Sequence, residues 1–326
     1  MKIFKFFFYM ILLAVLIFCG SAYYTYHYFT NPYLKEDKFF IVDKGTTFKE
    51  IVGNLSNEGV IDSKAKVLFL HLPRLIYGNK VNIKAGEYKF SANTSLFEIL
   101  RQLKNGKIYY RKLTFAEGLS NDSILKIIDS ATGLMGDLPT KEIAEGTLLP
   151  ETYLYTYGDT KKELIARMQK AMIDFFNEEW LKRATDLPYK TKQEALSLAS
   201  IVEKETGIPE ERGKVASVFV NRLRRKMRLQ SDPTVVYAFA KGNKDLERPI
   251  KKSDLRRVSE YNTYIIKGIP ESPITNPGKD AIRAVLNPDK TDYLYFVANG
   301  NGGHNFSKTL KEHNKFVGKY RNITEN

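Results

Sequence analysis

Residues 194–206 read EALSLASIVEKET. The stretch begins with the apolar spacing of a buried helix and ends in two carboxylates, Glu203 and Glu205, one residue apart. Carboxylates in the last turn of a helix are usually solvated, so this ending alone does not establish a catalytic role. The position of each side chain on the helix, and the residues further along the chain, bear on that role.

On a helical wheel of about 100° per residue, Glu203 continues the apolar stripe of Leu196 and Ala199. Glu205 continues a different stripe, which it shares with Glu194. This predicts that Glu203 has the more apolar surroundings, and apolar surroundings raise the pKa of a carboxyl group. A glutamic acid that is protonated near neutral pH can serve as the general acid that cleaves a glycosidic bond. Because Glu203 and Glu205 project about 200° apart, we do not expect them to form an acid and nucleophile pair.

Three polar stretches follow this helix, and all three have the composition of loops. They are residues 229–237 (LQSDPTVVY), 259–278 (SEYNTYIIKGIPESPITNPG) and 300–309 (GNGGHNFSKT). Any one of them is explained by turn formation, because Asn, Pro and Gly build turns. Together they also supply amide, carboxylate and hydroxyl groups of the kind that bind sugar hydroxyl and acetamido groups.

Length and charge limit the classes of function. The chain has 326 residues, which suggests about two domains. Its net charge of +14 indicates an acidic partner: nucleic acid, an anionic membrane or an anionic cell-wall polymer. The sequence contains neither a phosphate-binding glycine loop nor a His pair at metal-binding spacing, so we expect no cofactor and no metal.

The N-terminus favours a membrane location. Lys2 and Lys5 precede an uncharged run over residues 6–29, long enough to span a bilayer. Positive charge before the run predicts a cytoplasmic N-terminus, a single pass and a domain outside the membrane. The one cysteine, Cys19, follows Phe18, where a lipoprotein signal needs a small residue, so lipidation is not expected. A tethered external domain argues against nucleic acid as the partner.

The rest of the chain divides by pattern into two parts. Residues 45–59 (GTTFKEIVGNLSNEG) align with 93–107 (NTSLFEILRQLKNGK), which indicates a repeated unit of strand, turn and helix within 39–106. Further helices are predicted at 122–132, 161–184, 191–206 and 209–227. In the last hundred residues we expect a single helix, around 278–287, and a hairpin over 292–309.

Several ordered motifs resemble one family, the MltG (YceG-like) endolytic murein transglycosylases. The similar segments are LASIVEKET (198–206), ERGKVASVFVNRLRRKMRLQSDPTVVYA (211–238), YNTYIIKGIPESPITNPG (261–278), YLYFVANGNGGHNFSKTLKEHN (293–314) and AEGTLLPETYLY (144–155). The resemblance implies an α+β fold in three parts. These are a cytoplasmic stub, transmembrane helix and stalk over 1–35, a small LysM-like module over 36–112, and a larger catalytic domain over 113–326.

The resemblance also implies a function: cleavage of nascent glycan strands between N-acetylmuramic acid and N-acetylglucosamine, forming an anhydro-muramic end and terminating strand elongation. It places the catalytic glutamate at Glu203. The substrate-binding residues that it implies are Glu205, Gln230, Asp232, Asn262, Thr263, Tyr264, Asn276 and His304. Expected partners are peptidoglycan strands, the cytoplasmic membrane and, as candidates, peptidoglycan synthases.

Two other functions remain open at this point. A hydrolytic muramidase would use water in place of the muramic hydroxyl group and would leave a reducing end. A non-catalytic scaffold would bind peptidoglycan without cleaving it. Product mass separates the first from a transglycosylase, and the absence of cleavage identifies the second.

Overall fold

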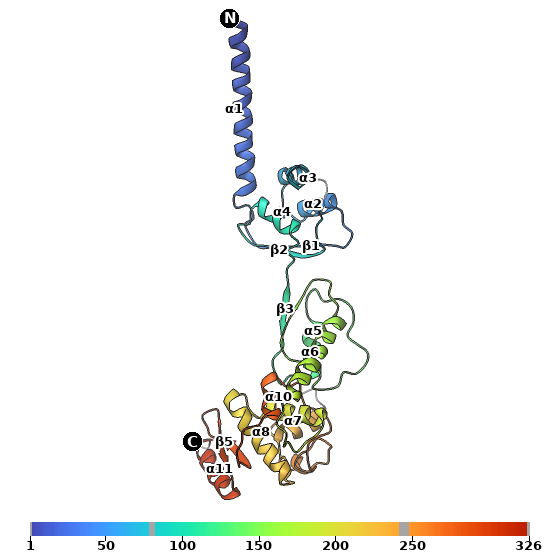
Figure 1. Cartoon of the computed structure of the whole chain (residues 1–326), viewed down its shortest axis with the longest axis vertical. Coiled ribbons are helices and arrows are strands. Elements are labelled where there is room, and N and C mark those ends of the chain that lie inside the picture. The colour runs from blue at the N-terminus through green and yellow to red at the C-terminus, as the bar shows by residue number, and fades with distance from the viewer. Residues whose placement is uncertain (1, 78–81, 241–247, 325–326) are drawn as a thin grey trace. The chain divides into compact units, whose positions relative to one another are not determined.

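A computed structural model describes residues 2–77, 82–240 and 248–324. The ends of the predicted segments 1–35 and 113–326, at residues 1 and 325–326, therefore lie outside the described residues. The chain forms two compact units (Figure 1). The first comprises Met1–Arg111 with Leu154–Gly158, and the second comprises Lys112–Tyr153 with Asp159–Asn326. The fold is mixed α+β with an apolar N-terminal helix, as predicted.

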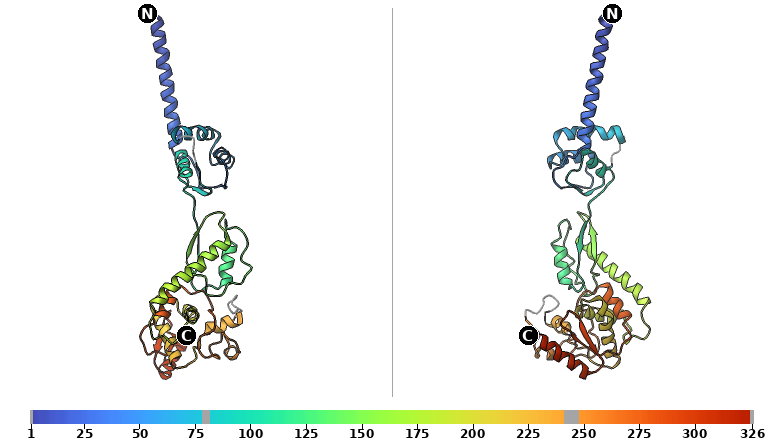
Figure 2. Two further views of the ribbon diagram at one scale, coloured as in Figure 1. Left: turned by 45° about the vertical axis from the view of Figure 1, so that its right-hand side comes forward. Right: turned by 90° about the vertical axis from the view of Figure 1, so that its left-hand side faces the viewer.

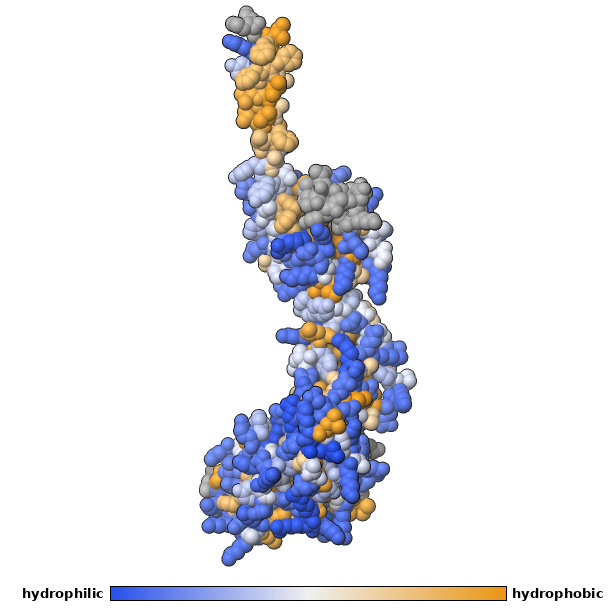
Figure 3. Space-filling model, viewed as in Figure 1, coloured by the Kyte–Doolittle hydropathy of each residue, from blue (hydrophilic) through white to orange (hydrophobic). Residues whose placement is uncertain are grey.

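The N-terminal helix α1, Lys2–Thr30, is the most apolar element of the first unit. Its segment Ile3–Thr30 has a hydropathy of 2.4 and is long and apolar enough to cross a membrane. Apolar side chains cover the face of this helix seen in Figure 3. Membrane anchors and signal sequences share this length and composition, so these two properties establish an apolar helix and do not distinguish between the two roles.

The remainder of the first unit confirms the predicted repeat of strand, turn and helix. Strand β1, Lys38–Val42, pairs antiparallel with β2, Gly86–Phe90. Each strand is followed by a turn and a helix: α2, Phe48–Asn57, after β1, and α4, Leu96–Lys104, after β2. Helix α3, Ser63–Tyr77, lies between the two halves of the repeat in sequence.

Local sequence sets these helix boundaries. Thr47 caps α2, and Glu50 completes a reciprocal capping box with it, so the first free backbone donors are satisfied. Ser95 caps α4 in the same way through its hydroxyl group. Four side chains of α4 are buried in the core of this unit: Leu96, Ile99, Leu100 and Leu103. The resemblance to a LysM-like module stays a prediction.

The second unit is larger and mostly helical. Its elements, together with the pair of strands at the unit boundary, are β3 (Arg111–Thr114), α5 (Asn121–Asp129), β4 (Thr152–Tyr155), α6 (Lys161–Leu181), α7 (Lys192–Glu205), α8 (Pro209–Arg224), α9 (Asp232–Ala240), a 3₁₀ turn (Asp254–Arg256), α10 (Lys279–Leu286), β5 (Tyr295–Ala298), β6 (His304–Ser307) and α11 (Leu310–Thr324). Strand β3 pairs with β4, and β5 forms the predicted antiparallel hairpin with β6. Figure 2 shows the long helix α6 running along one side of this unit.

Helix α7 is the central helix of this core. A capping box between Thr191 and Glu194 starts it, and the extended backbone of Thr206 ends it. Its two serines, Ser197 and Ser200, are both completely buried. Ser197 donates to the carbonyl of Pro270 at 2.8 Å, and Ser200 accepts from the backbone of Ile274 at 2.9 Å. The loop before α10 therefore covers the side of α7 that carries these serines.

Two helices in the last hundred residues contradict the prediction of a single one there. Helix α9, with the sequence DPTVVYAFA, lacks a polar face and is rich in β-branched and aromatic residues, which favour strands. Helix α11 has few apolar residues, so its helical period is weak in the sequence. Packing against the hairpin of β5 and β6 stabilises α11 in spite of this weak local pattern.

Candidate active site

The candidate catalytic pocket lies where α7 ends. Glu205, the last residue of that helix, lines a pocket of about 340 Å³. The other lining residues are Arg222, Leu229, Gln230, Asp232, Tyr264, Tyr295, Phe296, Leu310 and His313. The hydroxyl group of Ser231 donates to Glu205 Oε1 at 2.5 Å. Burial raises the pKa of Glu205 to about 7, and the negative charge of Asp232 adds to this rise.

Three of the predicted binding residues share this pocket with Glu205. Asp232 opens α9 and accepts a hydrogen bond at 2.5 Å from the hydroxyl group of Tyr264. Burial, followed by this bond to Asp232, raises the pKa of Tyr264, so its phenol stays protonated. Gln230 adopts a left-handed backbone with φ of 50°, which is strained for a residue with a side chain. A strained backbone that presents a polar side chain to a pocket is typical of functional sites.

The sequence did not single out the other residues of this lining, among them Arg222, Tyr295 and His313. Arg222 is buried, and its guanidinium donates to the carbonyls of Leu294 at 2.7 Å and Leu229 at 2.8 Å. His313, on the unpredicted helix α11, stacks on Tyr295 with a centroid distance of 5.2 Å. Burial, and then the charge of Arg222, lowers the pKa of His313, so its ring is neutral at neutral pH. Only a prediction of α11 from the sequence would have suggested His313 as a residue of this pocket.

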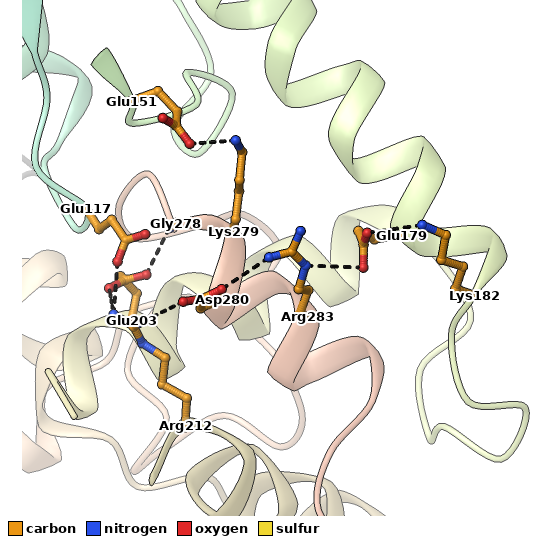
Figure 4. A network of polar contacts seen from close by, with 10 residues as sticks. All are labelled: Glu117, Glu151, Glu179, Lys182, Glu203, Arg212, Gly278, Lys279, Asp280 and Arg283. Carbon is orange, nitrogen blue, oxygen red and sulfur yellow. Dashed lines mark hydrogen bonds and ion pairs between the residues drawn. The ribbon is translucent and has the colours of Figure 1, made fainter. Parts of the chain in front are cut away.

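Glu203 belongs to a different set of contacts, a polar network that links α7, α8 and α10 (Figure 4). Its Oε2 atom accepts from the backbone N–H of Gly278 at 2.8 Å, and Gly278 caps the N-terminus of α10. Its Oε1 atom accepts from the guanidinium of Arg212 at 3.3 Å. Arg212 also contacts Glu117 at 2.9 Å and Asp280 at 3.5 Å. The Glu203 carboxylate thus has a backbone donor and a cation beside it.

The predicted rise in the pKa of Glu203 is present, but the contacts of the two carboxylates do not give Glu203 the more apolar surroundings. Burial raises the pKa of Glu203, but the Gly278 N–H and Arg212 stabilise its charged form and oppose that rise. No cation of the described residues forms an ion pair with Glu205, and burial raises its pKa to about 7 although the charges of His304 and Arg222 oppose the rise. The helical wheel compares only neighbours on one helix, whereas the groups that decide the environments come from α8 and from the loops before α9 and α10.

Three predicted binding residues, Asn262, Thr263 and Asn276, are completely buried, with their polar groups bonded within the protein. Asn262 donates to the carbonyl of Arg257 at 2.7 Å and accepts from the backbone of Tyr264 at 3.0 Å. The hydroxyl group of Thr263 accepts from the backbone of Ser231 at 2.9 Å. Asn262 thus fixes the segment that carries Tyr264, and Thr263 holds that segment against the loop that carries Gln230.

Asn276 and His304 likewise connect segments of the fold. The side chain of Asn276 accepts from the backbone of Leu148 at 2.9 Å and donates to Asn121 at 2.8 Å. His304 Nδ1 lies 2.7 Å from Glu211 Oε2, outside the lining of the Glu205 pocket. Burial tends to raise the pKa of Glu211, but the contacts with His304 outweigh it and hold the pKa below its usual range. His304 therefore connects the hairpin to α8.

Across residues 2–77, 82–240 and 248–324, no group of three or more His, Cys, Asp or Glu residues is arranged to hold a metal ion. The expectation that the protein needs neither metal nor cofactor stays a prediction.

Comparison with known proteins places the chain in a family. The model of the YceG-like family matches residues 40–319. An endolytic murein transglycosylase of Bacillus subtilis (strain 168) is 33% identical over 325 residues, which cover 89% of this chain and 87% of the relative. A second, from Streptococcus pneumoniae serotype 2, is 26% identical and covers 96% of this chain, which spans 64% of that longer relative.

A solved structure agrees with this placement. The crystal structure of a putative yceG-like protein from Listeria monocytogenes, at 2.6 Å, is 30% identical to this chain. The alignment covers 86% of this chain and 99% of the Listeria chain, with a TM-score of 0.51. From the match over residues 40–319, together with the identity and coverage of the Bacillus relative, we conclude that this chain belongs to the YceG-like family.

Proposed function

We propose that this protein is an endolytic murein transglycosylase, the activity for which its relatives are named. The observation that carries the proposal is a single glutamate with a raised pKa in a polar pocket. A glutamic acid that is partly protonated near pH 7 can protonate the leaving oxygen of a glycosidic bond. Murein strands supply such bonds between N-acetylmuramic acid and N-acetylglucosamine.

Glu205 acts in both steps of the proposed reaction. Its carboxylic acid donates a proton to the glycosidic oxygen, and the bond from that oxygen to the anomeric carbon of the muramic sugar breaks. The 6-hydroxyl oxygen of the same sugar then bonds to the anomeric carbon, and its proton passes to the Glu205 carboxylate. The acid is regenerated, and the product ends in a 1,6-anhydro ring. No water is consumed.

The family resemblance had placed this role at Glu203, which remains the alternative assignment. Geometry favours Glu205 because it lines the pocket, whereas Glu203 bonds to Gly278 and Arg212 away from that lining. We assign Glu203 a structural role in joining the end of α7 to the start of α10. Among the predicted binding residues, Gln230, Asp232 and Tyr264 are proposed to contact substrate. The buried Asn262, Thr263 and Asn276 are proposed to position the surrounding loops, as is His304.

Asp232 makes a hydrolytic muramidase the second candidate function, because it places another carboxylate in the Glu205 pocket. A pair of carboxylates can activate water or stabilise a glycosyl intermediate. Mass spectrometry of soluble products from purified peptidoglycan separates the two reactions. We expect products that are one water lighter than reducing-end muropeptides. Reducing ends alone would establish the muramidase, and no release of fragments would favour a scaffold.

We also propose that α1 anchors the protein in the cytoplasmic membrane with a single pass. The stalk to residue 35, a LysM-like module over 36–112 and a catalytic domain over 113–326 would then lie outside the cytoplasm. The support is the 28-residue apolar helix preceded in sequence by Lys2. Peptidoglycan synthases are candidate partners, because an enzyme that terminates strands acts where strands are made.

This topology predicts the behaviour of a reporter fused after Asn326. Alkaline phosphatase, which is active only outside the cytoplasm, should be active and should sediment with membranes. The positive charge near the start of α1 retains that end in the cytoplasm, so the chain after the helix is exported. An active reporter in a soluble, shortened chain would instead identify α1 as a cleaved signal sequence. If the alkaline phosphatase fusion is inactive and soluble, while a reporter that works only in the cytoplasm is active at the same position, export is excluded.

A further inference from the structure

A second concave surface lies next to α11 in the second unit. We call it the lysine groove. It has a volume of about 370 Å³ and is lined by Tyr293, Phe306, Ser307, Lys308, Glu312, Lys315, Phe316 and Lys319. Tyr293 and Phe306 pack together with ring centroids 5.6 Å apart and contribute aromatic surface. Aromatic side chains thus lie beside lysines at the edge of this groove.

The charges at the groove are unevenly compensated. Lys308 forms an ion pair with Asp292 at 3.0 Å. The Glu312 carboxylate accepts backbone hydrogen bonds at the N-terminus of α11, so it is already occupied. Lys315 and Lys319 are exposed, and no carboxylate among the described residues forms an ion pair with either. Two lysines four residues apart on a helix repel one another, and an anion between them would remove that repulsion.

A buried serine is also among the residues that line the groove. Ser307 is 2% exposed, and its Oγ atom has no hydrogen-bond partner among the described residues. Buried polar groups in folded proteins are nearly always paired, so an unpaired one requires an explanation. A polar group of a bound ligand would supply the missing partner.

We propose that the lysine groove binds the carboxylate-bearing peptide attached to the muramic sugar of the strand being cleaved. The inference rests on the proposed function, because it places this peptide beside the glycan that occupies the Glu205 pocket. Helix α11 connects the two sites: Leu310 and His313 line the pocket, and Lys315 and Lys319 line the groove. At about 100° per residue the two pairs face different sides of α11, so the peptide would pass around the helix to reach the groove. An extended peptide spans ~3.3 Å per residue, so a few residues cover the width of a helix.

The lining favours a peptide over a polyphosphate or a lipid headgroup. A murein peptide combines carboxylates with alanine methyl groups and backbone amides. The two lysines complement the carboxylates of the peptide, and the aromatic rings can pack against its methyl groups. The hydroxyl group of Ser307, which has no partner among the described residues, can bond to its amides. A polyphosphate would use only the lysines, and its binding would not require the aromatic surface.

The test compares two substrates with the full-length protein in detergent. One consists of glycan strands with peptides, and the other of the same strands after an amidase has removed the peptides. The test variant is Lys315→Gln with Lys319→Gln. The control is Lys311→Gln with Lys162→Gln, which removes two exposed lysines outside the groove lining. Cleavage gives kcat/KM, and calorimetry with a muropeptide and its peptide-free disaccharide measures binding without cleavage.

We expect the test variant to lose about tenfold in kcat/KM on peptide-bearing strands, since two solvent-exposed ion pairs are lost. It should match the parent on stripped strands, and the control should match the parent on both. Equal loss on both substrates, or no loss, overturns the inference. The inference is also overturned if inorganic polyphosphate competes with the strands and free murein peptide does not. If the parent cleaves neither substrate, the proposed function fails, and calorimetry alone decides whether the groove reads the peptide.

Discussion

Glu205→Gln abolishes strand cleavage, whereas Glu203→Gln retains it: this is the expected result if the pocket geometry identifies the catalytic acid. Glutamine keeps the size of Glu205 and can accept the hydrogen bond from Ser231, but it cannot deliver a proton. General acid–base assistance contributes roughly 10²–10⁴-fold to a rate, and here one residue serves as both acid and base. We therefore expect product release to fall by about four orders of magnitude or to become undetectable.

Glu203→Gln provides the matched comparison on the same helix. Its carbonyl oxygen can still accept from Gly278 or Arg212, while the ion pair with Arg212 is lost. Activity per folded molecule should stay within about tenfold of the parent, because positioning is weakened while the proton donor remains. Anhydro-muropeptide release, with the folded fraction measured by circular dichroism, gives both quantities. An inactive folded Glu203→Gln protein beside an active Glu205→Gln protein would restore the assignment based on the family motif.

The pH dependence follows from the same residue. Because burial raises the pKa of Glu205 to about 7, its acid form predominates below that pH and disappears above it. The kcat/KM should therefore fall as pH rises through about 7, approaching tenfold per pH unit. Asp232, His304 and Arg222 are the ionisable groups that influence Glu205, and of these only the charge of Asp232 raises its pKa. Asp232→Asn should shift the fall in activity to lower pH.

Arg212→Met should cause the largest loss of stability. Arg212 is 8% exposed, and its cation contacts the carboxylates of Glu203, Glu117 and Asp280. Removing the cation leaves the buried Glu203 carboxylate, whose side chain is 5% exposed, beside other negative charges. Loss of one partner from a buried ion pair typically costs about 3–5 kcal/mol, so we expect a decrease of that size in the free energy of unfolding.

The single tryptophan provides the measurement. Trp180 packs against the core that contains α7 and α8, so its fluorescence during urea unfolding reports on the second unit. The control is Arg224→Met, which breaks an ion pair with Asp186 that is largely exposed. Exposed pairs contribute about 0–1 kcal/mol, so the control should unfold near the parent midpoint.

Acid should reduce the effect of Arg212→Met. Without the cation, the pKa of Glu203 rises further, and a protonated Glu203 carries no uncompensated charge. The stability deficit should therefore be present near neutral pH and should shrink as the pH falls and Glu203 becomes protonated. A deficit as small as that of Arg224→Met at neutral pH would show that the network in Figure 4 contributes little to folding.

The sequence by itself determined features that depend on local chemistry. The capping boxes at Thr47 and Thr191 start their helices because hydroxyl and carboxylate groups satisfy nearby backbone donors. The hairpin of β5 and β6 follows from alternating apolar residues around a glycine-rich turn. The apolar N-terminal helix follows from an uncharged run of residues, which can be identified without knowing what the helix packs against. Each of these signals lies within a short segment.

Only the tertiary structure decided which groups surround Glu203 and Glu205. The partners that hold Glu203 come from α8 and from the residue that caps α10, and the hydroxyl group that meets Glu205 belongs to the loop before α9. Gly278 lies 75 residues from Glu203 and Ser231 lies 26 residues from Glu205. Arg212 is only nine residues from Glu203 but belongs to the next helix, so the period of α7 records none of these contacts. Likewise, α11 forms because the hairpin packs against it, and with α11 come His313 and the lysine groove. The pKa of a carboxyl group depends on every charge and dipole near it in space, whereas a helical wheel counts only the neighbours on one helix.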